Sequence, residues 1–104
     1  GGVIVGTFSF IIGDEPTYRV LLNGHWHADR PYGTIHRLAS KGTAHGVARA
    51  CFSFCLGIMD YVRIDTHENN HTMQSAITGY GFRKCGNIYA SNGTLRTAYD
   101  FIRP

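Results

Sequence analysis

The sequence is poor in charged residues and has no long apolar run. Charged residues make up 16% of the 104 residues and hydrophobic residues 43%, a balance that excludes a disordered tail or a charged linker. Like charges never gather in a run, so the net charge of +3 leaves no pattern typical of nucleic-acid binding. No apolar stretch reaches the roughly 18 residues of a transmembrane helix. We therefore expect a single folded domain, residues 1–104, with no nucleic-acid or membrane partner.

Cysteine is also scarce. Cys51, Cys55 and Cys85 are odd in number, in a sequence with enough apolar residues to build a core. We expect free, buried thiols in a protein of the reducing cytoplasm. The start, Gly1-Gly2-Val3, carries no initiator Met, no basic segment and no signal cleavage site. It has the pattern of a strand entered from a turn, and we expect that the beginning of a longer chain is missing.

Glycine, in contrast, is abundant, and it separates segments with the patterns of strands and helices. The apolar, alanine-containing run 47–59 is longer than a typical strand and predicts a buried helix. Asn69 or Asn70 is suited to cap a second helix that reaches about Thr78 and ends at Gly79. Five strands are expected, at residues 3–12, 32–39, 61–65, 82–90 and 94–102.

The resulting order of elements is β-β-α-β-α-β-β. Its central strand-loop-helix-strand unit requires a parallel crossover, while Ser91-Asn92-Gly93 predicts an antiparallel hairpin of the last two strands. We therefore expect an α/β fold with a mixed sheet. Within the crossover, the glycine-bearing loop 40–46 follows a strand and opens a helix, where free N–H groups and the helix dipole favour anions.

The segment after the second strand resembles the acetyl-CoA signature of the GNAT acetyltransferases. In that family a strand-ending Val is usually followed, two residues on, by Pro and then by Arg-Gly-x-Gly-x-Gly/Ala. Leu38 takes the place of the Val, Ser40 that of the Pro, and residues 43–48 that of the six-residue core. Within this core Gly46 and Ala48 match the family pattern, whereas the first two residues do not.

A second segment resembles the family in register with the first. Asn70-x-x-Met73 followed by Gly81-Phe82 is similar to the second family signature, Asn-x-x-Ala…Gly-Phe. The resemblance extends over nearly the whole chain and is closest to a subgroup of small bacterial GNAT proteins. Neither motif is specific by itself. The two together, in the expected strand-helix order, imply the C-terminal core of a GNAT-like domain.

The resemblance implies acetyl-CoA as the co-substrate and no metal. Backbone N–H groups at the first turn of the helix would hold the pyrophosphate of coenzyme A. In this sequence these groups belong to His45, Gly46, Val47 and Ala48. The main chain of Leu38 and Ser40 is expected to pair with the pantetheine arm as a strand would, and the amide of Asn70 to reach the same arm. The alternative is an ordinary turn followed by a helix-capping Asn.

GNAT proteins transfer an acetyl group from the thioester to a primary amine by direct attack, and a backbone N–H near Leu38 is the implied oxyanion donor. For the catalytic base, His67 is our first candidate and His36 the second, because imidazole exchanges protons near neutral pH. Each is equally well explained as a structural histidine. The family often places a tyrosine acid seven residues after the Asn, where this sequence has Ile77. Tyr80 lies three residues later and off the expected face.

A complete GNAT domain begins with a strand, two helices and a further strand, and the resemblance implies that these elements are missing here. We therefore expect a core that keeps much of the cofactor site but forms no normal active site alone. The sequence does not reveal the acceptor amine. The strand expected at residues 3–12 would have lost its neighbour, and an open edge of this kind predicts a homodimer.

Two other functions remain open. One is a binding module with the same fold that holds acyl-CoA or a partner protein without turnover. The other follows from His67-Glu68-Asn69-Asn70-His71, which matches the His-Glu-x-x-His motif of zinc hydrolases. That chemistry needs both histidines on one face of a helix. His25 and His27, with Asp29, add potential ligands in an irregular segment, where the pattern more often indicates a solvated turn.

Overall fold

The computed structural model describes residues 2–5, 8–38 and 44–104, with side chains for residues 8–38 and 46–104. The strands of this part are β1 (Gly2–Val5), β2 (Phe8–Ile12), β3 (Gly33–His36), β4 (Tyr61–His67), β5 (Arg83–Tyr89) and β6 (Leu95–Ile102). The helices are α1 (Ala44–Ile58), α2 (His71–Tyr80) and the short 3₁₀ helix η1 (Pro16–Tyr18). Neither α1 nor α2 is long and apolar enough to cross a membrane.

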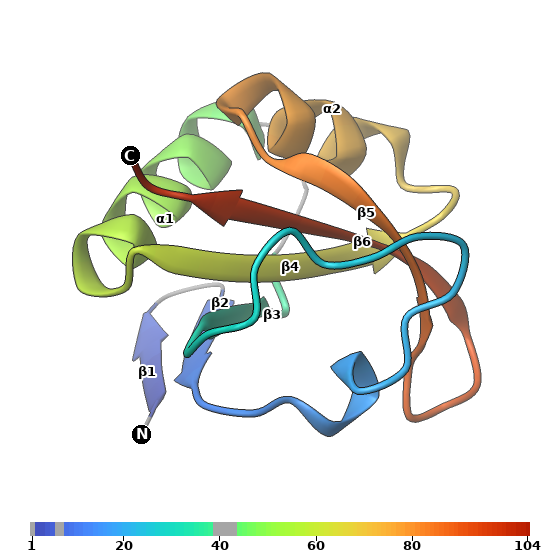
Figure 1. The fold of residues 1–104 in the computed structure, drawn as a ribbon. Coiled ribbons are helices and arrows are strands. Elements are labelled where there is room, and N and C mark those ends of the chain that lie inside the picture. The colour runs from blue at the N-terminus through green and yellow to red at the C-terminus, as the bar shows by residue number, and fades with distance from the viewer. Residues whose placement is uncertain (1, 6–7, 39–43) are drawn as a thin grey trace.

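The described strands form one mixed sheet in the order β1-β2-β3-β4-β6-β5. Among them only β3 and β4 pair in parallel, and α1 makes the crossover between these two. The strands at both ends of the sheet, β1 with β2 and β5 with β6, pair as antiparallel hairpins. The mixed α/β sheet with a central parallel crossover is therefore confirmed (Figure 1).

The single strand expected at residues 3–12 was wrong, because β1 and β2 lie there as two antiparallel strands. Val3 pairs with Phe10, and Ile4 pairs with Ser9. Gly6 lies between the two strands, but a single glycine also occurs inside strands, and the β-branched and aromatic residues on both sides of it had the pattern of one run. β1 is thus the neighbour that we expected the strand to lack. The observed order becomes β-β-β-α-β-α-β-β, and the open edge on this side of the sheet is β1.

The two faces of the sheet are covered by segments of different kinds. On one side, here called the helix face, α1 and α2 lie together (Figure 1). The core beneath them includes the buried side chains of Phe10, Ile35, Phe52, Val62, Ile64 and Ile77. On the opposite side, the loop face, the long segment 13–32 crosses the sheet. The second core, on this face, contains Tyr18, Tyr32, Tyr61, Ile88 and Ala98.

The caps of α2 explain where this helix begins and ends. Oδ1 of Asn70 accepts a hydrogen bond from the N–H of Met73 at 3.1 Å, which confirms Asn70 as the cap. The helix continues through Gly79 and stops at Gly81, which has a φ of +127°, so the expected end at Gly79 was wrong. A glycine stops a helix only where the backbone turns into a conformation that other residues avoid, and the chain makes that turn at Gly81.

The three thiols are free, as expected. Cys51 and Cys55 lie buried in α1, and Cys85 lies buried in β5. The hydrogen bond with Cys55, and then burial, raise the pKa of the Cys51 thiol. These two cysteines therefore belong to the core of the helix face as small apolar side chains.

Candidate active site

The parallel strands β3 and β4 separate before β4 ends. Their register stops at the pair Ile35–Ile64, while β4 continues to His67 along its other neighbour, β6. β3 ends at His36, and Arg37 adopts a φ of +61°, which is uncommon for a residue with a side chain. The strand expected to run to Ala39 therefore ends earlier, and Ala39 itself lies outside the described residues. A slot opens between the ends of the two strands.

The slot has a cavity on each face of the sheet. The cavity on the helix face has a volume of about 180 Å³, and Leu38, His67 and Asn70 are among its lining residues. The cavity on the loop face is larger, about 460 Å³, and Glu15, Thr17, His36 and Ala90 are among its lining residues. Arg37, Asp65 and Arg96 line both cavities. The two cavities therefore meet at the slot, so that ligands on opposite faces of the sheet could approach each other there.

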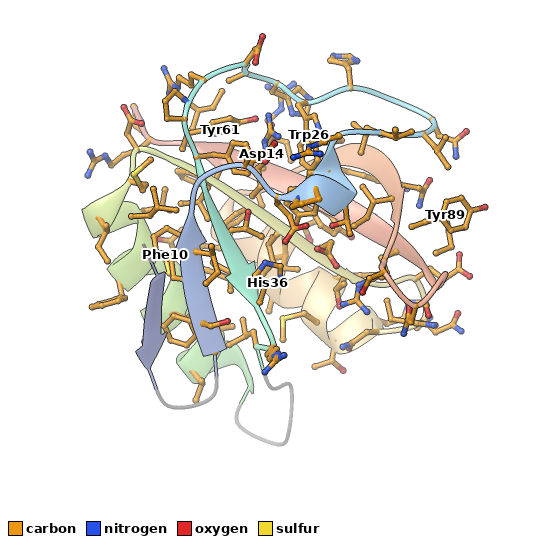
Figure 2. The ribbon with its side chains drawn as sticks, turned by 90° about the horizontal axis from the view of Figure 1, so that it is seen from below. Phe10, Asp14, Trp26, His36, Tyr61 and Tyr89 are labelled. Atoms are coloured by element: carbon orange, nitrogen blue, oxygen red, sulfur yellow. The ribbon has the colours of Figure 1, made fainter. Side chains whose placement is uncertain are left out.

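A histidine–carboxylate pair faces the cavity of the loop face. Nε2 of His36 lies 3.1 Å from Oε1 of Glu15, and Figure 2 shows His36 at the end of β3. The other carboxylate oxygen, Oε2, accepts hydrogen bonds from the N–H and the hydroxyl of Thr17, both at 2.9 Å. The His36 side chain is 31% exposed. Thr17 thus orients Glu15, Glu15 orients His36, and the imidazole remains open to a ligand.

Asp65, in contrast, is already satisfied on both oxygens. Oδ2 accepts a hydrogen bond from the Tyr18 hydroxyl at 2.5 Å, and Oδ1 is paired with Nε of Arg96. Burial, and then the charge of Asp65, raise the pKa of the Tyr18 phenol well above its ordinary value, so Tyr18 remains a donor. Asp65 therefore lies in the wall of the slot with one protein partner on each carboxylate oxygen.

The arrangement of strands and helices matches a solved structure. The crystal structure of an acetyltransferase of the GNAT family from Streptococcus agalactiae 2603 aligns with this chain at a TM-score of 0.81 and 30% sequence identity, over 93% of this chain and 58% of that one. The chain has the GNAT fold. It spans 58% of the length of that crystallised protein. No protein-family model and no curated protein matches its sequence.

On the helix face, the fold brings together three of the site residues expected from the sequence. Leu38, His67 and Asn70 come from three different segments and line one cavity. Leu38 also packs against the apolar core. The Asn70 side chain holds the N–H of Met73, so the capping function proposed as its alternative is present in the structure.

The predicted pyrophosphate donors lie at the start of α1. The helix begins at Ala44, and the first four N–H groups of a helix have no partner inside it. His45, Gly46 and Val47 fall among these four. Ala48 is the fifth residue of the helix, its N–H faces a carbonyl one turn back, and its side chain is 0% exposed. Ser40 lies outside the described residues.

His67 occupies a position that differs from the one the zinc motif requires. It ends β4, and its Nδ1 accepts a hydrogen bond from the N–H of Asn69 at 3.1 Å. His71 begins α2 after the intervening turn. The two histidines therefore do not share one helix face, and the segment 67–71 lacks the geometry that a zinc hydrolase needs.

Neither Ile77, at the position where GNAT proteins often have a tyrosine acid, nor Tyr80 lines the slot. Ile77 is fully buried in the core of the helix face. Tyr80 packs on Phe52 with ring centroids 5.2 Å apart, and its hydroxyl lies 3.0 Å from Oγ of Ser53. Among the described residues, no tyrosine lines either cavity of the slot.

Sequence reasoning missed Glu15, Tyr18 and Arg96. Glu15 and Tyr18 belong to the irregular segment 13–32, whose path across the loop face follows from no periodicity. Arg96 lies opposite His67 in the β4–β6 register, and a correct strand order would have placed it beside the slot. The Asn92-Gly93 pattern predicts that β5 and β6 pair, but it does not show which of these two strands lies next to β4.

Proposed function

We propose that this chain forms the cofactor-binding core of an N-acetyltransferase, which transfers an acetyl group from acetyl-CoA to a primary amine by direct attack. The observation that carries the proposal is the slot between β3 and β4. It joins a cavity beside Leu38 and the start of α2 to a cavity beside the His36–Glu15 pair. The 30% identity with a GNAT acetyltransferase over 93% of this chain supports the same function.

The helix face fits coenzyme A as a ligand. Leu38 follows the end of β3 and lines the cavity of the helix face, and we assign its N–H to the pantetheine arm or to the oxyanion of the reaction. The first turn of α1 offers the N–H groups of His45, Gly46 and Val47 to the pyrophosphate. When bound, acetyl-CoA supplies the thioester carbon that the amine attacks. We assign Asn70 to the positioning of α2, because its oxygen is used in the cap.

The loop face supplies the base, and here His36 replaces our first candidate, His67. Glu15 lies at Nε2 of His36 and favours the tautomer with the proton on that nitrogen. Nδ1 then carries the lone pair that accepts a proton from the acceptor ammonium. His67 is the weaker candidate because its Nδ1 already accepts the N–H of Asn69. Without a tyrosine at the slot, we propose that the thiolate leaves unassisted and takes its proton from water.

A binding module without turnover is the second candidate function. Ile77, which is 0% exposed, takes the position where GNAT proteins often have the tyrosine acid. The lack of an acid at this position favours a module that binds without turnover. Such a module would hold acyl-CoA by the same backbone groups. The two functions differ in turnover alone, so a binding experiment tests what they share.

Calorimetric titration of the chain with acetyl-CoA, in EDTA, is the test. We expect saturable binding by the original chain and its loss in Gly46→Phe, because the ring would occupy the place of the pyrophosphate. A Cβ at Gly46 meets no atom within 4 Å, so the position has open space for a side chain, and circular dichroism of the variant checks that it is folded. Gly57→Phe is the matched control, since Gly57 lies in the same helix and has equally open space.

Each outcome of this titration has a separate meaning. A folded chain that does not bind acetyl-CoA contradicts both candidate functions for this chain. Equal binding by Gly46→Phe and the original chain contradicts the location of the pyrophosphate at the first turn of α1. Loss of binding in Gly57→Phe as well would attribute the effect to the helix as a whole, and not to the site.

A further inference from the structure

A separate polar cluster lies where the segment 13–32 meets β5 and β6. Nδ1 of His27 is 2.6 Å from Oδ1 of Asp100 and 3.4 Å from Sγ of Cys85. The three atoms all lie within 4.8 Å of one another. Cys85 and Asp100 are buried, and the His27 side chain is 14% exposed. None of the three lines the cavities of the slot, so the cluster is independent of the candidate active site.

A β-bulge and two glycines build the cluster. β5 and β6 shift register at Cys85, which therefore lacks a residue opposite it, and a bulge of this kind re-aims a side chain. A Cβ on Gly24 would lie 1.8 Å from the carbonyl oxygen of Cys85, and one on Gly86 would lie 2.3 Å from that of Leu22. Because neither residue has a side chain, the loop lies directly on β5, and this contact brings His27 to Cys85.

The carboxylate of Asp100 is held by partners that leave one oxygen for the cluster. Oδ2 accepts hydrogen bonds from the Tyr61 hydroxyl and from the N–H of His27, both at 2.8 Å. Oδ1 is directed at the His27 ring. The buried cation of this face, Arg63, donates to the Tyr61 hydroxyl and to the carbonyl of Ala28, and makes no hydrogen bond to Asp100 among the described contacts. Partners of this kind orient a metal ligand and tune its basicity.

The cluster also has an open side. A cavity of about 190 Å³ is lined by His27 and Asp100, together with residues at the start of β5 and the end of β6. It gives an ion a route from solvent and leaves room for a water molecule. Three protein ligands and one water form the usual coordination of a zinc ion that is not fully enclosed.

We propose that His27, Cys85 and Asp100 bind a divalent transition-metal ion of the zinc class, with water as the fourth ligand. Nitrogen, thiolate and carboxylate donors are those that zinc takes, at about 2.0–2.3 Å, and the observed atoms need to separate by only about 1 Å to enclose the ion. The ion takes the place of the proton between His27 and Asp100, so that His27 binds as a neutral imidazole with its proton on Nε2, and the thiol of Cys85 releases its proton to water. The thiolate and the carboxylate balance its charge. The bound ion fastens the segment 13–32 to the sheet.

Titration of the metal-free chain with Co²⁺, in a phosphine reductant that does not bind metals, tests the site. We expect one equivalent to bind, with the near-ultraviolet charge-transfer band of a cobalt–thiolate bond. Zn²⁺ should displace the cobalt and raise the melting temperature. Cys85→Ser should abolish the band, and His27→Gln should weaken Zn²⁺ binding by at least about 10-fold.

The controls use matched residues of the same chain. His25 is exposed, and its ring centroid lies 5.4 Å from that of His27, so His25→Gln removes a neighbouring histidine and should leave binding unchanged. Cys55→Ala removes a buried thiol from α1 and should also leave the band unchanged. Absence of a thiolate band in the original chain would overturn the proposal without the use of any variant. Equal binding by His27→Gln, or equal loss in His25→Gln, would overturn the assignment of the ligands.

Discussion

The helix face and the loop face of this sheet are stabilised by different interactions. On the helix face, regular elements bury apolar side chains such as Phe52 and Ile77. On the loop face, the guanidinium of Arg63 lies 4.0 Å from the ring centroids of both Trp26 and Tyr32. Figure 2 shows the loop over this face, with Trp26 and Tyr61 beneath it. The helix face is stabilised mainly by burial of apolar side chains, which does not depend on direction. The loop face depends also on hydrogen bonds and cation–ring contacts, which form only at particular distances and angles.

The irregular backbone of the loop explains this difference. An irregular segment pairs only a few of its own N–H and C=O groups, here for example at residues 15–19, and groups buried without partners are costly. Side chains of the sheet act as those partners. The carbonyl of Ala28 accepts from Arg63 and Tyr61, at 3.0 and 3.1 Å, and the N–H of His27 donates to Asp100 at 2.8 Å. The buried polar residues of β4 and β6 are therefore part of what holds the loop.

The largest effect is expected on the helix face. Phe52 is 0% exposed, and Phe52→Ala should lower the free energy of unfolding by about 3–5 kcal/mol, because it leaves a cavity under both helices. Urea denaturation followed by circular dichroism measures the change. Phe54, on the same helix, is 45% exposed, and Phe54→Ala should cost less than about 1 kcal/mol. Similar losses in the two variants would contradict the apolar core described for this face.

The next effect concerns chemistry on the loop face. His36→Gln should lower the kcat of acetyl transfer by about 100-fold, or about 2.7 kcal/mol, because the amine loses its base. The affinity for acetyl-CoA should not change, since His36 lines the other cavity. Release of free coenzyme A in a screen of primary amines measures the rate. His67→Gln is the matched control and should change the rate only slightly. A larger loss of kcat in His67→Gln than in His36→Gln would show that the base is on the helix face.

A smaller loss of stability is expected from the buried cation. Arg63→Met should lower the free energy of unfolding by about 2 kcal/mol, because the ring contacts are lost and the Ala28 carbonyl loses a donor. Trp26 is the only tryptophan, so native-state fluorescence reports this face alone. We expect its emission to change in Arg63→Met and to stay the same in Phe52→Ala. If both variants altered the emission equally, the two faces would not be separate units.

The smallest effect is a pH dependence on the loop face. Burial and Asp65 raise the pKa of Tyr18 in the folded chain, whereas a tyrosine of the unfolded chain ionises at about pH 10. Above that pH the unfolded state binds fewer protons, so the free energy of unfolding falls as pH rises. Tyr18→Phe should cost about 1 kcal/mol at pH 8, and the gap to the original chain should narrow above pH 10. Urea midpoints across this range test the sign, and a widening gap would contradict it.

The sequence predicted the helix face well and the loop face poorly. Run 47–59 and the Asn70 cap gave both helices to within a few residues, because periodicity and capping are local. The resemblance pointed to Leu38 and Asn70 as cofactor-binding residues, and both line the helix-face cavity of the slot. The errors at residues 3–12 and at Gly79 both arose where one residue type is compatible with two backbone conformations. The His36–Glu15 pair joins positions 21 apart in the sequence, and no pattern along the chain links them.

The sequence by itself determined the elements, their alternation and the parallel crossover, because propensity, capping and the hand of the connection act between near neighbours. The tertiary structure decided which of the histidines acquires a partner. His67 ends β4 and accepts a hydrogen bond from the turn that follows it. His36 contacts Glu15, and His27 contacts Asp100 and Cys85. The physical reason lies in the loop 13–32. Its buried polar backbone groups need hydrogen-bond partners on the sheet, and those long-range partners fix the path of the loop.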